Sequence, residues 1–269
     1  MMALKRYSMW LSLAACFVLA ASGRSPAQTA TLDRKADGPA TRPVVRHHNR
    51  IPYDAPLIDP PGKTMGGISR GAGSNDSPFV VVLAPKDGGI TIKSRPRLYW
   101  YLSKMADERH SIVLAINRLG IPGQTAMPKT VFEVQIPQPA EAGIQCLDLA
   151  QPPAGEKNQL TLEPGVNYEW VVEFMIHDLH DKSLNPYSRC ALRYQPPKQD
   201  LINALKGADA SDLAIACGRQ GVWFDALAAL RDAIQSHPQD TQLQGDWEDF
   251  LAEGGIAVDH GRIIPPAQQ

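Results

Sequence analysis

Apolar and polar residues alternate along much of the segment 78–194. The longest run covers 168–176, where every second residue is apolar: Tyr168, Trp170, Val172, Phe174 and Ile176. Shorter runs of the same kind lie at 97–102, 112–116, 132–136 and 160–162, and 79–83 is a continuous apolar run. A period of two predicts strands with one face in a core.

Gly-, Pro- and Asp-rich turns separate these segments, and no helical pattern lies between them. Parallel strands would need long crossover connections, which are usually helices. We therefore predict that 66–196 is an antiparallel β-sandwich of the fibronectin/immunoglobulin type, with Leu98, Trp100, Trp170 and Phe174 in its core. The string 162–170 (LEPGVNYEW) resembles the corner of fibronectin type III-like domains, where a turn precedes a strand whose Tyr and Trp enter the core.

After Pro196-Pro197 the apolar period changes to that of helices. Two stripes are predicted, one with Trp223, Leu227, Leu230 and Ile234 and one with Leu243, Trp247, Phe250 and Leu251. Ser211 and Asp240 are predicted N-caps. The fold class is thus mainly β with a C-terminal α part, a short tetratricopeptide-like hairpin over 197–258, followed by a tail at 259–269. One hairpin cannot bury its apolar face alone, so we expect it to dock on the sandwich or on a partner.

The N-terminus has the three parts of a signal peptide. Lys5 and Arg6 precede an uncharged apolar stretch at 7–21, and small residues at 25–27 offer a cleavage site. The stretch is shorter than the roughly 20 residues that span a bilayer. We predict a signal peptide over 1–27, a periplasmic or extracellular mature chain without a transmembrane span, and a Pro-rich irregular segment over 28–65. A lipid anchor on Cys16 is the lesser alternative.

The charge balance argues against a nucleic-acid partner. The chain has 27 Lys and Arg against 28 Asp and Glu. Lys5, Arg6 and Arg24 lie in the predicted leader, which leaves 24 basic and 28 acidic residues. A slightly acidic mature chain lacks the excess of positive charge that neutralises phosphates.

Three cysteines follow the leader. An oxidising compartment favours a disulfide between Cys146 and Cys190, which both lie in strand-like segments. The alternative is that these two and Cys217 are reduced core residues. Their spacing matches no zinc signature.

Three other patterns are candidates for chemistry. His177, Asp178, His180 and Asp181 could bind a divalent metal, or they could form an ordinary solvated loop at a strand end. Tyr99 and Tyr101 alternate with core residues, so they could stack on sugar rings or pack against the helices. The pattern G-x-S-x-G at 67–71 is that of a serine hydrolase, but no strand precedes it and no helix follows it.

Several motifs together resemble the family called domain of unknown function 928, which comprises exported bacterial proteins. They are Gly67-Ile-Ser69-Arg70-Gly71, Ser94-Arg95-Pro96, Tyr168-x-Trp170, the run 221–227 (GVWFDAL), and Trp247 with Leu251. The resemblance covers roughly 66–258 and implies export but no activity. It also implies that a cysteine often follows the Tyr-x-Trp strand, where this chain has His177, so a disulfide here would differ from the family's.

These patterns predict an exported, non-enzymatic binding or assembly module of the cell envelope, with an envelope protein or glycan as partner and no cofactor. The alternatives are a metal-binding protein or metal-dependent enzyme that uses the loop 177–181, and a carbohydrate-binding module.

Overall fold

The structure is a computed structural model that describes residues 50–56, 78–120, 127–138, 140–153, 159–259 and 262–264. The predicted signal peptide and the G-x-S-x-G pattern lie outside these residues. All the described residues belong to one compact unit. Within the described ranges, no helix is long and apolar enough to cross a membrane.

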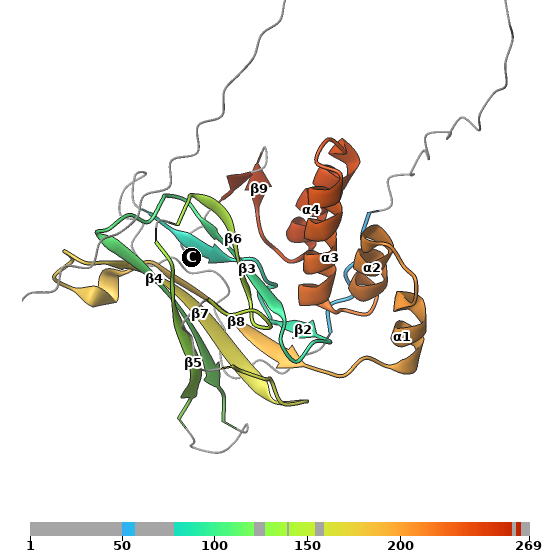
Figure 1. Cartoon of the computed structure of the whole chain (residues 1–269), viewed down its shortest axis with the longest axis horizontal. Helices are drawn as coiled ribbons and strands as arrows, with labels where there is room; N and C mark the ends of the chain where they lie inside the picture. Colours follow the sequence, from blue (N-terminus) through green and yellow to red (C-terminus); the bar gives the residue numbers. More distant parts are fainter. Residues whose placement is uncertain are drawn as a thin grey trace, which may run out of the picture. The chain divides into compact units, whose positions relative to one another are not determined.

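The strands form two main sheets (Figure 1). The smaller sheet has the order β1-β3-β6, all antiparallel, with β1 (Val80–Val82), β3 (Arg97–Leu102) and β6 (Gly143–Asp148). The larger sheet has the order β2-β8-β7-β4-β5, with β2 (Gly89–Thr91), β8 (Tyr187–Tyr194), β7 (Asn167–Ile176), β4 (His110–Arg118) and β5 (Lys129–Ile136). A 3-10 helix, η1 (Lys182–Leu184), precedes β8, and β9 (Val258–Asp259) pairs with β10 (Arg262–Ile263).

The alternation along the strands predicts their buried faces correctly. Leu98, Trp100, Trp170 and Phe174 each expose 1% or less of their surface. In β4 the three inward residues Ile112, Leu114 and Ile116 are fully buried as well. The mainly β architecture with antiparallel sheets and C-terminal helices is therefore confirmed.

Two details of the strand prediction are wrong. Strand β2 pairs with β8 in parallel, not antiparallel. It has three residues, too few for a period of two to be visible, and the long chain between β2 and β8 supplies the return path that a parallel pair needs. The segment around Leu162 is not a strand, although its side chain is buried and its N–H donates to Ser94 O (2.9 Å).

Four helices follow β8: α1 (Gln199–Leu205), α2 (Ala210–Gly218), α3 (Trp223–Ser236) and α4 (Thr241–Glu253). The predicted cap Asp240 is confirmed, because its side chain accepts from the N–H groups of Gln242 and Leu243. The cap of α2 is Asp209 and not Ser211, because α2 begins at Ala210 and the Asp209 side chain accepts from the Asp212 N–H.

The helices gather beside β2 and β3 and share one apolar core with the sheets (Figure 1). Trp223 is the central contact. Its ring stacks on Phe250 with centroids 4.3 Å apart, and its Nε1 donates to Leu83 O at the end of β1 (2.9 Å). The expectation that the helices dock on the β part is confirmed.

Residues 50–56, which we call the strap, pack on the helices without regular secondary structure of their own. Ile51 is buried, and the Tyr53 ring lies edge-on to Trp223 with centroids 4.9 Å apart. The N–H of Asp54 donates to Gly218 O (3.2 Å), and Arg50 forms an ion pair with Glu253. Part of the segment predicted as irregular is thus a component of the core.

Candidate functional site

A pocket of about 520 Å³ lies where β2 ends and the chain turns toward β3. The turn contributes Ile92, Lys93, Ser94 and Arg95, and Thr161 and Tyr194 complete the wall. The depression is shallow and open to solvent, so it would contact one side of a bound molecule.

Backbone hydrogen bonds hold the three segments of this pocket together. Thr91 and Tyr194 are register partners at the end of the β2–β8 pair. Beyond them the Gln195 N–H donates to Thr91 O, and the Leu162 N–H donates to Ser94 O, both at 2.9 Å. The side chains of Lys93, Arg95, Thr161 and Tyr194 therefore project from fixed backbone positions, which favours a preformed site.

Two cations give the pocket its charge. The Arg95 guanidinium donates from Nε to Thr161 Oγ1 (3.0 Å) and from Nη1 to Gln159 Oε1 (3.4 Å). Its Nη2 has no hydrogen-bond partner within the described residues. The side chain of Lys93 is 56% exposed and lies 4.0 Å from the carboxylate of Asp225. Such a pair of cations can hold an anionic group between them.

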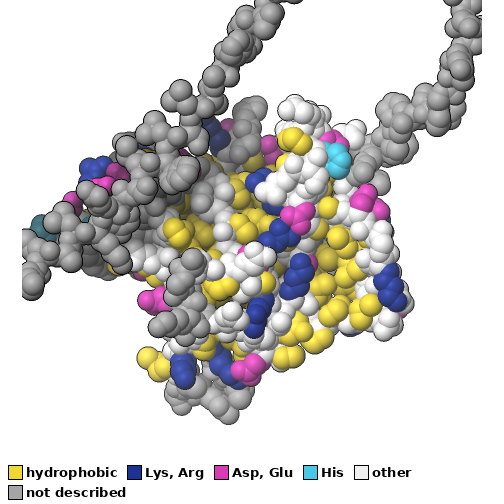
Figure 2. All heavy atoms as spheres, viewed as in Figure 1, with side chains coloured by type: hydrophobic (Ala, Val, Ile, Leu, Met, Phe, Trp, Pro, Cys, Tyr) yellow, Lys and Arg dark blue, Asp and Glu magenta, His cyan; other side chains and the backbone are white. Residues whose placement is uncertain are grey.

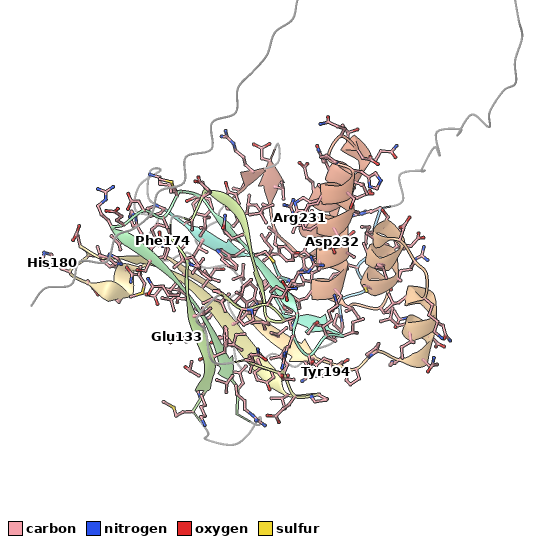
Figure 3. The ribbon with its side chains drawn as sticks, in the orientation of Figure 1. Glu133, Phe174, His180, Tyr194, Arg231 and Asp232 are labelled. Carbon is pink, nitrogen blue, oxygen red and sulfur yellow. The ribbon has the colours of Figure 1, made fainter. Side chains whose placement is uncertain are left out.

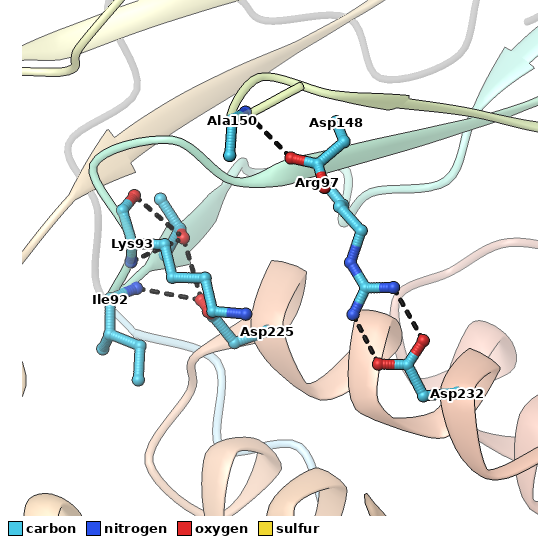
Figure 4. Close-up of polar contacts among 8 residues, drawn as sticks. Ile92, Lys93, Arg97, Asp148, Ala150, Asp225 and Asp232 are labelled. Carbon is cyan, nitrogen blue, oxygen red and sulfur yellow. Dashed lines mark hydrogen bonds and ion pairs between the residues drawn. The ribbon is translucent and has the colours of Figure 1, made fainter. Parts of the chain in front are cut away.

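Asp225, in the first turn of α3, is the buried carboxylate behind Lys93 (Figure 4). Its Oδ2 accepts from Thr91 Oγ1 (2.8 Å) and from the Ile92 N–H (2.9 Å), while its Oδ1 has no hydrogen-bond partner in the described part of the chain. Burial is the main cause that raises the pKa of Asp225 above its ordinary value. This carboxylate therefore fixes the backbone of the pocket turn to α3.

The burial of Asp225 predicts a pH dependence of stability. A raised pKa in the folded state means that the ionised carboxylate opposes folding. Relative to Asp225→Asn, the wild type should lose about 1.4 kcal/mol of unfolding free energy per pH unit as pH rises from the ordinary to the raised pKa, and no more above it. Denaturant unfolding of both proteins between pH 3 and 8 measures this difference.

Asp225→Ala is the matched comparison, because it removes the acceptor of Thr91 and Ile92. At neutral pH it should cost about 1–3 kcal/mol, more than Asp225→Asn. If the free energies of unfolding of the wild type and Asp225→Asn differ by the same amount at all pH values, the pKa of Asp225 is not raised.

A second ion pair also connects α3 to the β2–β3 segment. Arg97 in β3 donates from both terminal nitrogens to Asp232, at 2.7 and 2.6 Å (Figure 4). Asp225 and Asp232 are seven residues apart and lie on the same side of α3. The helix is therefore attached to the β2–β3 segment by two carboxylates.

The two tyrosines suggested for sugar stacking do not form an exposed row. Tyr99 is 4% exposed, and burial raises its pKa. It lies on the same face of β3 as Arg97, the face that α3 contacts. Tyr101 is half-buried, with its ring centroid 5.9 Å from that of Phe79. The accessible aromatic of the pocket is Tyr194 instead.

The loop at 177–181 lies far from this pocket, as the positions of His180 and Tyr194 in Figure 3 indicate. The Nε2 atom of His177 is 2.5 Å from Ser111 Oγ, a contact that the sequence did not predict. Asp181 accepts from the Ser183 N–H and hydroxyl at the start of η1, which lowers the pKa of Asp181. Over the described residues, no three His, Cys, Asp or Glu side chains come together in a way that could hold a metal ion.

Cys146, Cys190 and Cys217 are free thiols in the structure, which corresponds to the second of the two interpretations, that of reduced cysteines. Cys146 is exposed on β6 of the smaller sheet, opposite Tyr99. Cys190 is buried in β8 of the larger sheet, where its Sγ donates to Pro85 O (3.4 Å). Burial raises the pKa of Cys217 to about 12, so this thiol is protonated and inert at neutral pH.

A family model described as Domain of Unknown Function (DUF928) matches residues 65–259. No curated protein matches the chain. The match covers the two main sheets, the four helices and all residues of the pocket.

Proposed function

The chain belongs to the family described as Domain of Unknown Function (DUF928), and we propose that it is an exported, non-enzymatic binding module of the cell envelope. The signal-peptide pattern at 1–27 supports export to the periplasm or beyond. The ligand site in this proposal is the basic pocket formed by Lys93, Ser94, Arg95, Thr161 and Tyr194, and the ligand carries anionic groups.

We further propose that the two main sheets form a fibronectin/immunoglobulin-like sandwich that presents this pocket at one end. The Val82 N–H of β1 donates to Ser188 Oγ of β8 (3.0 Å), a buried contact between the sheets. The Tyr168 hydroxyl accepts from the Glu163 N–H five residues upstream (3.1 Å). A tyrosine bonded back to the preceding turn is a hallmark of such sandwiches.

The observation that carries the functional proposal is the position of the pocket's cations. Arg95 Nη2 has no hydrogen-bond partner among the described residues, and Lys93 is 56% exposed beside a buried carboxylate that accepts two hydrogen bonds. Lys93 is exposed and Arg95 is half-buried, so both cations can be reached from solvent at the pocket. This position favours binding of an anionic ligand.

The test is binding of purified protein to the isolated envelope material of the native organism. Lys93→Ala combined with Arg95→Ala should weaken binding at least about tenfold, because charge-assisted hydrogen bonds contribute about 1.5–3 kcal/mol each. Raising the salt concentration should weaken wild-type binding as well.

The matched control is Lys129→Ala combined with Arg219→Ala. Like the pocket variant, this variant removes one Lys and one Arg. Its two positions are exposed, in β5 and after α2, and lie outside the pocket. It should bind the envelope material like the wild type. Equal binding by the pocket variant and the wild type, with both folded, would rule out the pocket as the ligand site.

A further inference from the structure

We infer that the ligand of this pocket is an acidic polysaccharide whose sugar units carry carboxylates. The inference rests on the proposed function and deepens it by naming the ligand class. It depends on which donors of the pocket are still available, on its single aromatic ring and on its open shape.

Two backbone N–H groups of the pocket turn, those of Ile92 and Lys93, already have acceptors within the protein. The Ile92 N–H donates to Asp225, the Lys93 N–H donates to Thr91 Oγ1 (3.1 Å), and the Leu162 N–H donates to Ser94 O. Phosphate sites typically rely on free backbone N–H groups, as in nests and helix N-termini. Arg95 and Lys93 are the cationic donors of the pocket, and the planar edge of the Arg95 guanidinium matches a planar carboxylate, with Lys93 beside it.

The rest of the wall matches a sugar ring. Thr161 is exposed and Ser94 is half-buried, and each carries a hydroxyl that can donate to and accept from sugar hydroxyls. Tyr194 is half-buried at the end of β8, so part of its ring faces solvent at the pocket. An amphipathic ring of this kind can cover the apolar face of a sugar while its hydroxyl remains hydrated.

The shape and surroundings favour a polymer over a single sugar. The pocket is open at the surface, so a chain longer than the pocket can continue beyond it. Several Lys and Arg side chains are spread over this face of the molecule, with Asp and Glu side chains between some of them (Figure 2). A chain with one carboxylate per unit can contact several such cations, and each weak contact then adds to the affinity.

The experiment measures binding of the mature protein to three polymers at low ionic strength: polygalacturonate, neutral dextran and inorganic polyphosphate. Polygalacturonate should bind most tightly, and dextran at least about tenfold more weakly because it lacks the anionic group. Lys93→Ala with Arg95→Ala should reduce polygalacturonate binding at least about tenfold, whereas Lys129→Ala with Arg219→Ala should not.

Tyr194→Ala tests the ring, with Tyr194→Phe as its control. Alanine should weaken polygalacturonate binding several-fold, whereas phenylalanine keeps the ring and should bind nearly as the wild type does. Circular dichroism spectra and melting temperatures show whether each variant is folded.

The outcomes separate the two proposals. Equal binding of dextran and polygalacturonate, or tighter binding of polyphosphate, overturns the carboxylated polysaccharide while the pocket's role in envelope binding stands. Polygalacturonate binding that is the same in the wild type and both double variants overturns the assignment to this pocket. If the variant with Lys93→Ala and Arg95→Ala binds the envelope material as tightly as the wild type does, the proposed function itself is wrong.

Discussion

Replacing Trp223 with alanine is expected to lower the free energy of unfolding by about 3–5 kcal/mol. The side chain is fully buried and lies at the point where helices, strap and sheet meet. It stacks on Phe250, contacts the ring of Tyr53 edge-on, and donates to Leu83 O. Alanine would leave a cavity among these groups and a buried carbonyl without its donor. Urea unfolding followed by circular dichroism measures the loss.

Trp223→Phe is the control that separates the ring from its N–H group. Phenylalanine keeps an aromatic ring against Phe250 but removes the hydrogen bond to Leu83 O, so it should cost about 1–3 kcal/mol. If Trp223→Ala costs less than about 1 kcal/mol, the helices do not depend on this residue for their attachment to β1.

The sequence predicted the long strands well because their burial repeats every second residue. In β7 the five alternating apolar residues leave one choice of core face, and the structure follows it. Short elements carry no such repeat. Strand β2 has three residues, all buried, and its parallel partner lies about 100 residues later in the chain, so only the tertiary structure reveals the pair.

The candidate site could be predicted only in part, because three separate segments form it. The run Ser94-Arg95-Pro96 stood out through its resemblance to the family, but nothing in the sequence relates it to Thr161 or Tyr194. Asp225 lies in the run 221–227 that resembles the family, but no pattern in the sequence indicated that it contacts the segment after β2. An available signal was its position within a run of apolar residues, Trp223, Phe224, Ala226 and Leu227, which suggested burial.

The strap escaped prediction because its composition suggests disorder. Residues 50–56 combine two prolines with charged residues, and such segments rarely bury enough apolar surface to offset their ordering entropy. Here the segment needs to order only seven residues on a surface that the helices already provide. Its two apolar anchors, Ile51 and Tyr53, enter a core that otherwise would be open on this side.

A chain that begins at Leu57 should therefore be much less stable than one that begins at Arg50. Loss of the buried Ile51 alone corresponds to about 2–5 kcal/mol, and Tyr53 contributes its contacts with Trp223 and Phe250 in addition. We expect a loss of at least about 3 kcal/mol in unfolding free energy, measured by urea denaturation. The chain that begins at Arg50 should match the chain that begins at Gln28. Equal stability of the two shortened chains would contradict a structural role for the strap.

Gly218→Ala distinguishes strap packing from a general effect of shortening the chain. Gly218 ends α2, and a Cβ atom there would lie 2.5 Å from Pro52 O and 2.9 Å from Ile51 Cγ2. In the chain that begins at Arg50, this alanine must displace the strap backbone, so we expect a loss of about 1–3 kcal/mol. In the chain that begins at Leu57, the obstacle is gone, and alanine should be neutral or should stabilise the helix by up to about 1 kcal/mol. The cost of the substitution should thus disappear when the strap is removed, because the contacts shorter than 3 Å are those with Pro52 and Ile51. An equal loss in both chains would mean that Gly218 is constrained by the helices and not by the strap.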